Sequence, residues 1–491
     1  MLTVTGVSTP AAAPRRRSDP FGTIAMRMAS LSMLVALLVG CATYQPIPLD
    51  PKQSAAAFEA RVLDDPGLQK FLRDQPSQSA ASTPVWDLRR LSLVALYFHS
   101  DLDVARAKWQ AARAAAITAG ARPNPGINTS IEYNADAPKG VTPWSPDIGL
   151  SIPIQTAGKR HKRIAQAMQL AEAARLDLLD ASWLVRSRVR TGLLGAMASE
   201  TFLRRQQALE AERVRLMQRR VELGFAAQPD LTLSRIALQK TTLVADEAHK
   251  RLAENRATLA AALGLPVAAL NGIDVSLSEF DRVPAMSELP ANEVERQALL
   301  HRPDLLAALA EYRASESALQ LEVAKQYPDL TLSPGLLLDA GQAKWSLGLS
   351  LLLPLLDRNQ GPIAEAKAKR EQAAANVLAV QSRAIGEVER ALAGYRAAVE
   401  KLRAADALVA AQHKKEQSDV RMQRAGEIER SMLLGTQVEL AAAEQARLET
   451  LVQTQQALGA LEDAIRRPIA GATFALPDTI ETDPRHKDDA S

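Results

Sequence analysis

The chain has 491 residues, of which 47% are hydrophobic, 23% charged and 4% aromatic, with a formal net charge of +3. This apolar content excludes disorder for most of the length, and no uncharged run after residue 41 approaches the ~20 apolar residues of a membrane-spanning helix. The net charge resides entirely in residues 1–40, so the neutral remainder gives no electrostatic reason to expect a nucleic-acid partner. Few aromatic residues and long Ala-, Leu- and Gln-rich stretches favour extended helices packed through small side chains.

The first forty residues have the organisation of an export signal. Arg27 precedes the apolar run Leu31–Val39, which is followed by the small residue Gly40 and then by Cys41. A basic start, a short apolar core and a small residue before the cleavage point define such signals. We therefore predict a signal peptide over residues 1–40.

Cys41 is the only cysteine of the sequence, which excludes an intrachain disulfide and a cysteine-based metal site. The tetrad Leu38–Cys41 resembles the bacterial lipobox, in which the cysteine is lipidated and becomes the first residue. The resemblance implies that Cys41 is anchored in outer membrane lipid, because two acyl chains hold a protein stably, and that 41–85 is a lipidated linker. Met26 and Met28 are more natural starts for such a signal than the first residue.

The sequence contains an internal repeat with an offset of about 202 residues. Five landmarks spread over about 160 residues keep this offset within four residues. We predict a first repeat over 86–266, a connector over 267–291 and a second repeat over 292–468, followed by a disordered tail over 469–491. The matched landmarks are Asp101 and Asp304, Pro125 and Pro328, Gly149 and Gly348, Gly224 and Gly426, and Pro266 and Pro468.

Each repeat is predicted to begin with a helix and to continue with two strands. Apolar residues at helical spacing predict helices over 87–121 and 292–326, and a proline follows each of them. Strict alternation of apolar with polar or small residues then predicts half-buried strands, and segments of about ten residues with aromatic residues at their edges are typical of a transmembrane barrel hairpin. The predicted strands cover about 126–134, 146–154, 329–338 and 344–353.

Two very long helices follow each pair of strands. We expect them over about 158–223 and 230–263 in the first repeat, and over about 362–425 and 428–466 in the second. A helix of ~65 residues extends about 100 Å, which is longer than the core of a soluble globular domain.

These elements require several copies of the chain. Four strands cannot close a barrel, because their edges would leave backbone groups unpaired in lipid, and membrane barrels have at least eight strands. Two chains supply eight strands and three chains supply twelve. We therefore expect a mixed α+β membrane protein, a homo-oligomeric strand barrel continued by a long helical tube.

The ordered, duplicated motifs resemble those of the TolC-like outer membrane factors, the outer membrane efflux protein family. They include the Asp-Leu pair with following alanines in both repeats, and Asn124-Pro125 before the first strand. They also include Ile152-Pro153-Ile154, Leu353-Pro354-Leu355 and Gly264-Leu265-Pro266. Their arrangement behind a lipobox is similar to the lipidated branch of tripartite RND-type efflux systems.

The resemblance implies a homotrimer with a twelve-stranded outer membrane barrel, four strands from each chain, and an α-helical periplasmic barrel. Such a protein is a passive exit duct for small molecules or metal ions rather than an enzyme. Its implied partners are a periplasmic adaptor (membrane fusion protein) and an inner membrane pump of the RND or ABC type, with no nucleic acid. Two alternatives remain open: the outer membrane component of type I protein secretion, and a structural coiled-coil periplasmic lipoprotein without a pore.

The tips of the two helix hairpins are the candidate functional segments. A glycine that ends one helix and a proline or acid that begins the next is also simply how a helix hairpin is built. The resemblance adds contact with the adaptor at these tips. The residues concerned are Gly224, Phe225, Ala226, Gln228, Pro229, Gly426, Glu427, Ile428 and Arg430.

Asp230 and Glu429 are the candidate residues of a periplasmic gate. The resemblance implies that an acid shortly after the tip narrows the tunnel, but Met432 stands in the second repeat where Asp230 stands in the first. A solvated helix start, where carboxylates are favourable, explains both acids equally well.

Catalytic motifs and metal-ligand spacings are absent from the sequence. There is no phosphate-binding Gly-rich loop with Lys and Ser/Thr, no His-Glu-x-x-His and no Gly-x-Ser-x-Gly, and the six histidines are scattered. We therefore expect no cofactor and no resident metal. The basic run Lys159–Arg163, at the end of the second predicted strand, is interpreted as a solvated face rather than as a contact with anionic lipid headgroups or a lining of the tube.

Overall fold

The computed structural model describes residues 44–74, 85–197 and 201–469. The predicted signal peptide, Cys41 and the tail from residue 470 onward lie outside the described residues. Residues 58–491 group into one unit by their contacts. Helix α2 (Pro51–Glu59) spans its boundary.

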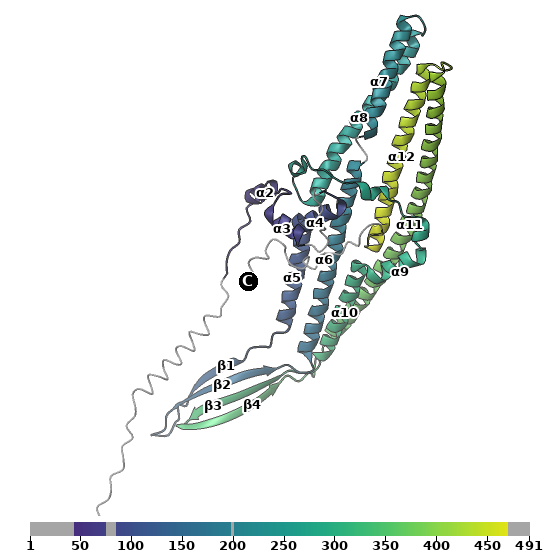
Figure 1. The fold of residues 1–491 in the computed structure, drawn as a ribbon. Helices are drawn as coiled ribbons and strands as arrows, with labels where there is room; N and C mark the ends of the chain where they lie inside the picture. Colours follow the sequence, from purple (N-terminus) through teal and green to yellow (C-terminus); the bar gives the residue numbers. More distant parts are fainter. Residues whose placement is uncertain (1–43, 75–84, 198–200, 470–491) are drawn as a thin grey trace, which may run out of the picture. The chain divides into compact units, whose positions relative to one another are not determined.

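Each repeat contains two short helices, two strands and a long helical hairpin (Figure 1). In the first repeat these are α4 (Leu88–Phe98), α5 (Ser100–Ala119), β1 (Gly126–Tyr133), β2 (Trp144–Ile154), α6 (Lys159–Met197), α7 (Thr201–Glu222) and α8 (Gln228–Leu263). In the second they are α9 (Ala291–His301), α10 (Pro303–Ala324), β3 (Leu330–Asp339), β4 (Gln342–Leu351), α11 (Gln360–Arg424) and α12 (Arg430–Ile465).

The helical stretches predicted over 87–121 and 292–326 each consist of two helices with a single-residue break between them. The break lies at His99 in the first repeat and at Arg302 in the second, and both residues have an extended backbone. His99 accepts the Asp101 amide hydrogen with Nδ1 at 3.2 Å and so caps α5. Arg302 precedes Pro303, and the residue before a proline is pushed out of the helical region.

The connector and the N-terminal segment both pack into the core of the first repeat. The connector contains three short 3₁₀ helices, and Phe280 of the second of them is buried in this core. Helix α3 (Pro66–Arg73) contributes Leu68, Phe71 and Leu72 to the same core. The two segments therefore have structural roles in the first repeat that the repeat pattern alone does not indicate.

The four strands form one antiparallel sheet in the order β1-β2-β3-β4. One face carries cross-strand apolar partners, such as Ile127 with Leu150 and Leu336 with Trp345. The other face is mostly small or polar: Gly149 lies opposite Gly335. Within the described sheet, β1 and β4 each have a neighbour on one side only.

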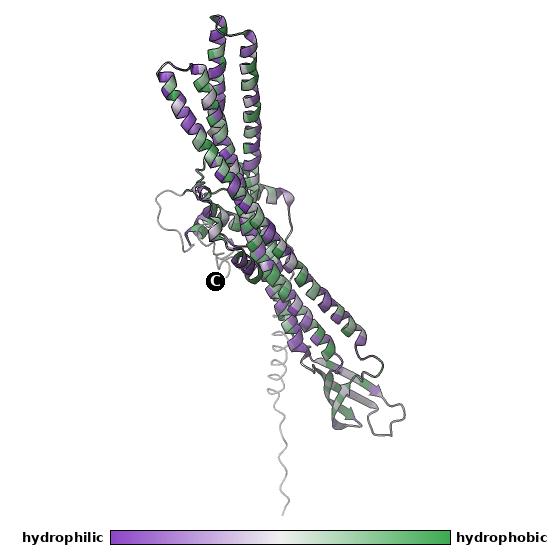
Figure 2. Cartoon of the chain, turned by 90° about the vertical axis from the view of Figure 1, so that its right-hand side faces the viewer, coloured by the Kyte–Doolittle hydropathy of each residue, from purple (hydrophilic) through white to green (hydrophobic). Residues whose placement is uncertain are grey.

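The long helices pack side by side in two ordered groups. Near the sheet, α5 contacts α6, α6 contacts α10, and α10 contacts α11. Toward the tips, α8 contacts α7, α7 contacts α12, and α12 contacts α11. Hydrophobic and hydrophilic residues are interspersed along the long helices (Figure 2). No helix among residues 44–74, 85–197 and 201–469 is long and apolar enough to cross a membrane.

Candidate functional site

Glycines in the left-handed backbone region form both hairpin turns. Gly224 has φ +77° and Gly426 has φ +76°, and an added Cβ would meet nothing within 4 Å at either position. The turn of the first hairpin ends at Ala227. Gln228 and Pro229 are therefore the first two residues of α8. These glycines are therefore required by backbone conformation and not by a close neighbour.

The two gate candidates have different surroundings. Asp230 Oδ2 accepts the backbone amide hydrogen of Ala227 at 3.2 Å, so this carboxylate caps its own helix. Glu429 instead forms an ion pair with Arg220, on the first hairpin, and accepts the Ser431 hydroxyl hydrogen at 3.0 Å. These bonds from Ser431 and Arg220 lower the pKa of Glu429.

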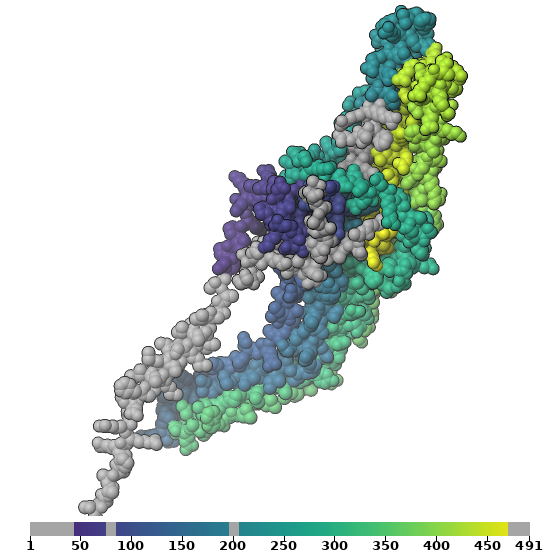
Figure 3. All heavy atoms as spheres, in the orientation of Figure 1, coloured from purple at the N-terminus to yellow at the C-terminus, as the bar shows by residue number. Residues whose placement is uncertain are grey.

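A second ion pair joins the same two hairpins. Arg430 Nη2 lies 2.7 Å from Glu212 Oε1 on α7, and Arg220 Nη1 also donates to the Ser431 hydroxyl at 3.2 Å. We call Arg220, Glu429, Arg430 and Glu212 the tip pairs. They hold the two hairpins of one chain together near the turns, where the teal and yellow-green tips lie adjacent in Figure 3.

The other tip residues are mostly open to solvent. Phe225 is 73% exposed, Glu427 is exposed and Ile428 is half-buried. The structure thus brings Arg430 and Glu429 into ion pairs within the chain, whereas the Phe225 side chain is mostly exposed.

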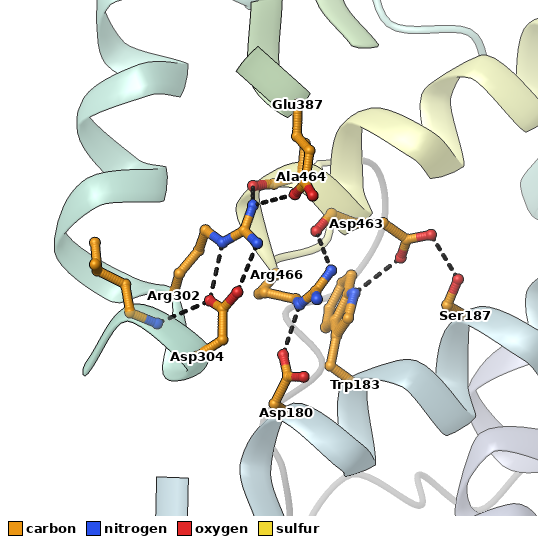
Figure 4. Close-up of polar contacts among 10 residues, drawn as sticks. Asp180, Trp183, Ser187, Arg302, Asp304, Glu387, Asp463, Ala464 and Arg466 are labelled. Carbon is orange, nitrogen blue, oxygen red and sulfur yellow. Dashed lines mark hydrogen bonds and ion pairs between the residues drawn. The ribbon is translucent and has the colours of Figure 1, made fainter. Parts of the chain in front are cut away.

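A buried arginine binds three helices together at the break between α9 and α10 (Figure 4). Arg302 is 1% exposed. Its guanidinium donates to both carboxylate oxygens of Asp304, to Glu387 on α11 at 2.7 Å and to the carbonyl of Ala464 on α12 at 2.9 Å. Burial works against the charge, but the two carboxylates prevail and raise the pKa of Arg302 above its usual value.

The end of α12 is tied to α6 beside this arginine. Arg466 terminates the helix in the left-handed region, with φ +54°, and its Nε donates to Asp180 at 2.6 Å. Asp463 accepts from the Trp183 indole at 2.8 Å and from the Ser187 hydroxyl at 2.6 Å. We call these contacts, together with those of Arg302, the Arg302 cluster.

A second group of buried charged side chains lies between α6 and α12, next to the Arg302 cluster. Glu462 on α12 is 2% exposed and lies 3.5 Å from both Arg186 and Arg190 on α6. Arg190 also donates to the carbonyl and side-chain oxygens of Gln455 at 2.6 and 3.0 Å. Burial lowers the pKa of Arg190, and the Glu462 carboxylate opposes this effect.

The interpretation of the basic run Lys159–Arg163 as a solvated face is wrong for three of its residues. Lys159 is buried, and its Nζ donates to Asp329 at 2.7 Å and to the Tyr327 carbonyl at 2.6 Å. Arg160 and Arg163 donate to carbonyls at the end of α5. Cations stabilise a helix C-terminus, because its carbonyls are unpaired and carry the negative end of the helix dipole.

The two repeats match the family model described as "Outer membrane efflux protein" over residues 94–265 and 294–465. The chain belongs to the outer membrane efflux protein family. The prediction of an efflux protein of the outer membrane, rather than an enzyme, is thereby confirmed. The four antiparallel strands and two helical repeats of the chain are the fold of this family.

Two characterised family relatives differ in the extent of the match. The chain is 27% identical over 480 residues to the pyoverdine export outer membrane protein OpmQ of Pseudomonas aeruginosa, covering 89% of this chain and 93% of OpmQ. It is 26% identical over 262 residues to the cobalt-zinc-cadmium resistance protein CzcC of Cupriavidus metallidurans, covering 52% of this chain and 60% of CzcC.

Solved structures of outer membrane channels have the same fold. The OprN channel superposes with a TM-score of 0.62 at 20% identity, covering 87% of this chain and 98% of OprN. The CmeC channel of Campylobacter jejuni has a TM-score of 0.59 at 18% identity, covering 87% of this chain and 93% of CmeC.

Metal-binding clusters are not found in the part of the chain that the structure describes. No group of three or more His, Cys, Asp or Glu side chains there could hold a metal ion.

Proposed function

We propose that this chain forms a homotrimeric exit duct, with a twelve-stranded β-barrel in the outer membrane and a helical tunnel in the periplasm. The duct passively conducts metal ions or small molecules that an inner membrane pump, of the RND or ABC type, delivers through a periplasmic adaptor. Cys41 is lipidated and anchors the N-terminus in the outer membrane.

The open four-stranded sheet carries this proposal. Its strands have 8 to 11 residues, the length that crosses a bilayer at a tilt. Apolar side chains such as Ile127, Ile148, Trp345 and Leu349 are exposed on one face. Two unpaired edges in lipid are not tolerated, so β1 and β4 need strands from further copies.

The names of the relatives support the class of cargo. CzcC is a cobalt-zinc-cadmium resistance protein, and OpmQ is a pyoverdine export protein. Divalent cations and a small molecule are therefore the first cargoes to test for this chain.

The hairpin tips are the proposed adaptor contact, and the tip pairs are the proposed closed gate. Phe225 and Glu427 are exposed at the turns, where an adaptor can reach them. Glu429 joins the two hairpins through Arg220, so separating the hairpins requires this pair to break. Asp230 caps α8 and remains a gate candidate through its place just after the turn.

Deletion of the gene in its native host tests the proposal. Cells lacking the chain should accumulate more cobalt, zinc or cadmium, or more of a small-molecule substrate, when measured by mass spectrometry after exposure. A plasmid copy should restore efflux, whereas a copy with Cys41→Ser should restore it less because the anchor is lost. Unchanged accumulation of all these compounds would contradict the proposal.

A further inference from the structure

A groove with a volume of about 380 Å³ lies between α6, α10 and α11. Its lining includes Pro362, near the start of α11, and Glu322, near the end of α10. The groove is therefore close to the sheet, because α10 leads into β3 and α11 follows β4. Its volume is within the range of ~300–1,000 Å³ that is typical of small-molecule sites.

Three neighbouring helices line this one groove. Helix α10 contacts both α6 and α11 and lies between them. Consecutive helices of a row can all line one groove only on the side toward which the row curves. When such a row closes into a tube, as in the proposed duct, that side is the inside. A solute in the duct therefore passes the groove on its way to the barrel.

One part of the groove lining is apolar. Its residues are Leu170, Ala314, Ala318, Pro362 and Ala366. Ala314 and Ala366 are buried, whereas Leu170 is 44% exposed. Such a surface gives no advantage to a hydrated metal ion, but it attracts the hydrocarbon part of an organic molecule, since contact removes apolar area from water.

The carboxylates of the groove differ in how their charge is neutralised. Glu365 is paired with Lys369 at 2.6 Å, and Glu322 is paired with Lys325 at 2.6 Å. Glu311 also lines the groove, but its side chain has no ion pair or hydrogen bond with any residue that the structure describes. Because Glu311 is exposed, a cation in the groove can reach it.

A second carboxylate without an ion pair among the described residues lies next to Glu311. Asp177 follows Leu170 by seven residues on α6 and is therefore on the same face of that helix. Partial burial, and then the Asp177 charge, raise the pKa of Glu311. Burial and Asp180 also raise the pKa of Asp177, against the opposing effect of Lys108. A bound cation would balance the negative charge at this end of the groove.

We propose that this groove binds monovalent organic cations with an apolar body as they pass through the duct. The positive group lies beside Glu311, and the apolar body covers Leu170, Ala318 and Ala366. One unpaired carboxylate beside apolar side chains fits a single positive charge joined to a hydrocarbon or aromatic body, and it repels anions. The inference rests on the proposed duct and names a class of cargo for it.

Binding of ethidium, a monovalent aromatic cation, to the purified full-length protein tests the groove. The fluorescence anisotropy of ethidium should rise when the unaltered chain is added, whereas that of the anion fluorescein should not. Glu311→Gln should weaken ethidium binding roughly three- to five-fold, because it removes one partly exposed charge. Ala318→Leu should also weaken binding, because the larger side chain fills part of the groove.

Glu371→Gln is the matched control for the loss of charge. Glu371 is an exposed carboxylate of α11 that does not line the groove, so ethidium binding should not change. Equal binding by the unaltered chain and all three variants would overturn the proposed site. An equal loss with Glu311→Gln and Glu371→Gln would overturn it as well, because the effect would then depend on net charge alone.

Conductance in planar bilayers separates failure of the groove from failure of the duct. If the unaltered chain conducts ions but ethidium binding does not depend on Glu311, the groove is not the site and the duct stands. If the unaltered chain gives no conductance, the proposed duct is overturned, and with it the role of the groove in transport.

Discussion

Arg302 shows how one residue can hold several elements at a fixed point. Its guanidinium is almost fully buried, and it donates to two carboxylates and to a carbonyl at the end of α12. The partners Asp304 and Glu387 are 30% and 33% exposed at their side chains, so water screens part of the attraction. The main role of Arg302 is therefore to fix the positions of α10, α11 and α12 relative to one another, and its net contribution to stability is smaller.

Replacing Arg302 with Ala should destabilise the fold. Removal of one partner of a buried ion pair costs ~3–5 kcal/mol, and partial exposure of the carboxylates puts this site at the lower end. The apparent Tm of the detergent-purified protein measures the effect. Arg296→Ala is the matched control, because that arginine pairs with Glu293 on an exposed helix face and should not change the Tm. Equal Tm values for the two variants would contradict the role of Arg302.

The role of a residue can be predicted when its partners are close in the sequence. It cannot be predicted when its partner lies far away in the sequence. The turns at Gly224 and Gly426 follow from local helix signals, and the bend at Arg302 was available from the proline that follows it. The burial of Arg190 depends on Gln455, 265 residues away. No periodicity within α6 indicates that partner, because the pairing arises only when the two repeats pack. The same reason explains Lys159, whose partner Asp329 lies in the other repeat.

Elements also contain positions where a small residue is required by a neighbour. Gly459 lies in the interior of α12, where glycine ordinarily weakens a helix relative to alanine. A Cβ at this position would collide with the Arg190 guanidinium. Gly435 lies on the same helix, and a Cβ there would meet nothing within 4 Å. Of the two glycines, only Gly459 is needed for packing.

Gly459→Ala and Gly435→Ala should therefore change stability in opposite directions. Gly435→Ala should stabilise by about 0.5–1 kcal/mol through helix propensity. Gly459→Ala should destabilise by roughly 1–3 kcal/mol, because Arg190 must leave buried hydrogen bonds to Gln455. Chemical denaturation of the purified protein measures both. A stabilising Gly459→Ala would show that Arg190 can move without loss.

At the scale of the whole molecule, the sequence predicts the elements of the fold better than the contacts that join the two hairpins. The repeat, the four strands and the hairpins were all readable, because each has a local periodicity and a long uninterrupted span. The tip pairs were not: Arg220 and Glu212 are ordinary helical surface residues until the two hairpins are brought together. The sequence predicts both Asp230 and Glu429 as gate candidates, yet the first caps its own helix and the second joins two hairpins.

Loss of a tip pair should make the closed duct easier to open. Arg220→Gln removes the bonds to Glu429 and Ser431 and should raise the open probability of single channels in planar bilayers by roughly two- to five-fold. Lys415→Gln is the control, since Lys415 pairs with Glu439 within one hairpin, 2.8 Å away, and this pair does not restrain the two hairpins. An increase with both variants would indicate general loosening of the helices and would count against the tip pairs as a gate.

The unbroken length of α11 has a mechanical consequence. Its 65 residues extend about 97 Å, and Glu387, the residue that Arg302 binds, divides it into arms of roughly 40 Å toward the sheet and 56 Å toward the tip. A stiff rod pivoting at this point moves its longer arm by about 1 Å for each degree of tilt and swings the shorter arm the opposite way by about 0.7 Å. In the proposed duct, a displacement of the tip would therefore accompany a smaller, opposite displacement at the sheet end of α11, unless the helix bends.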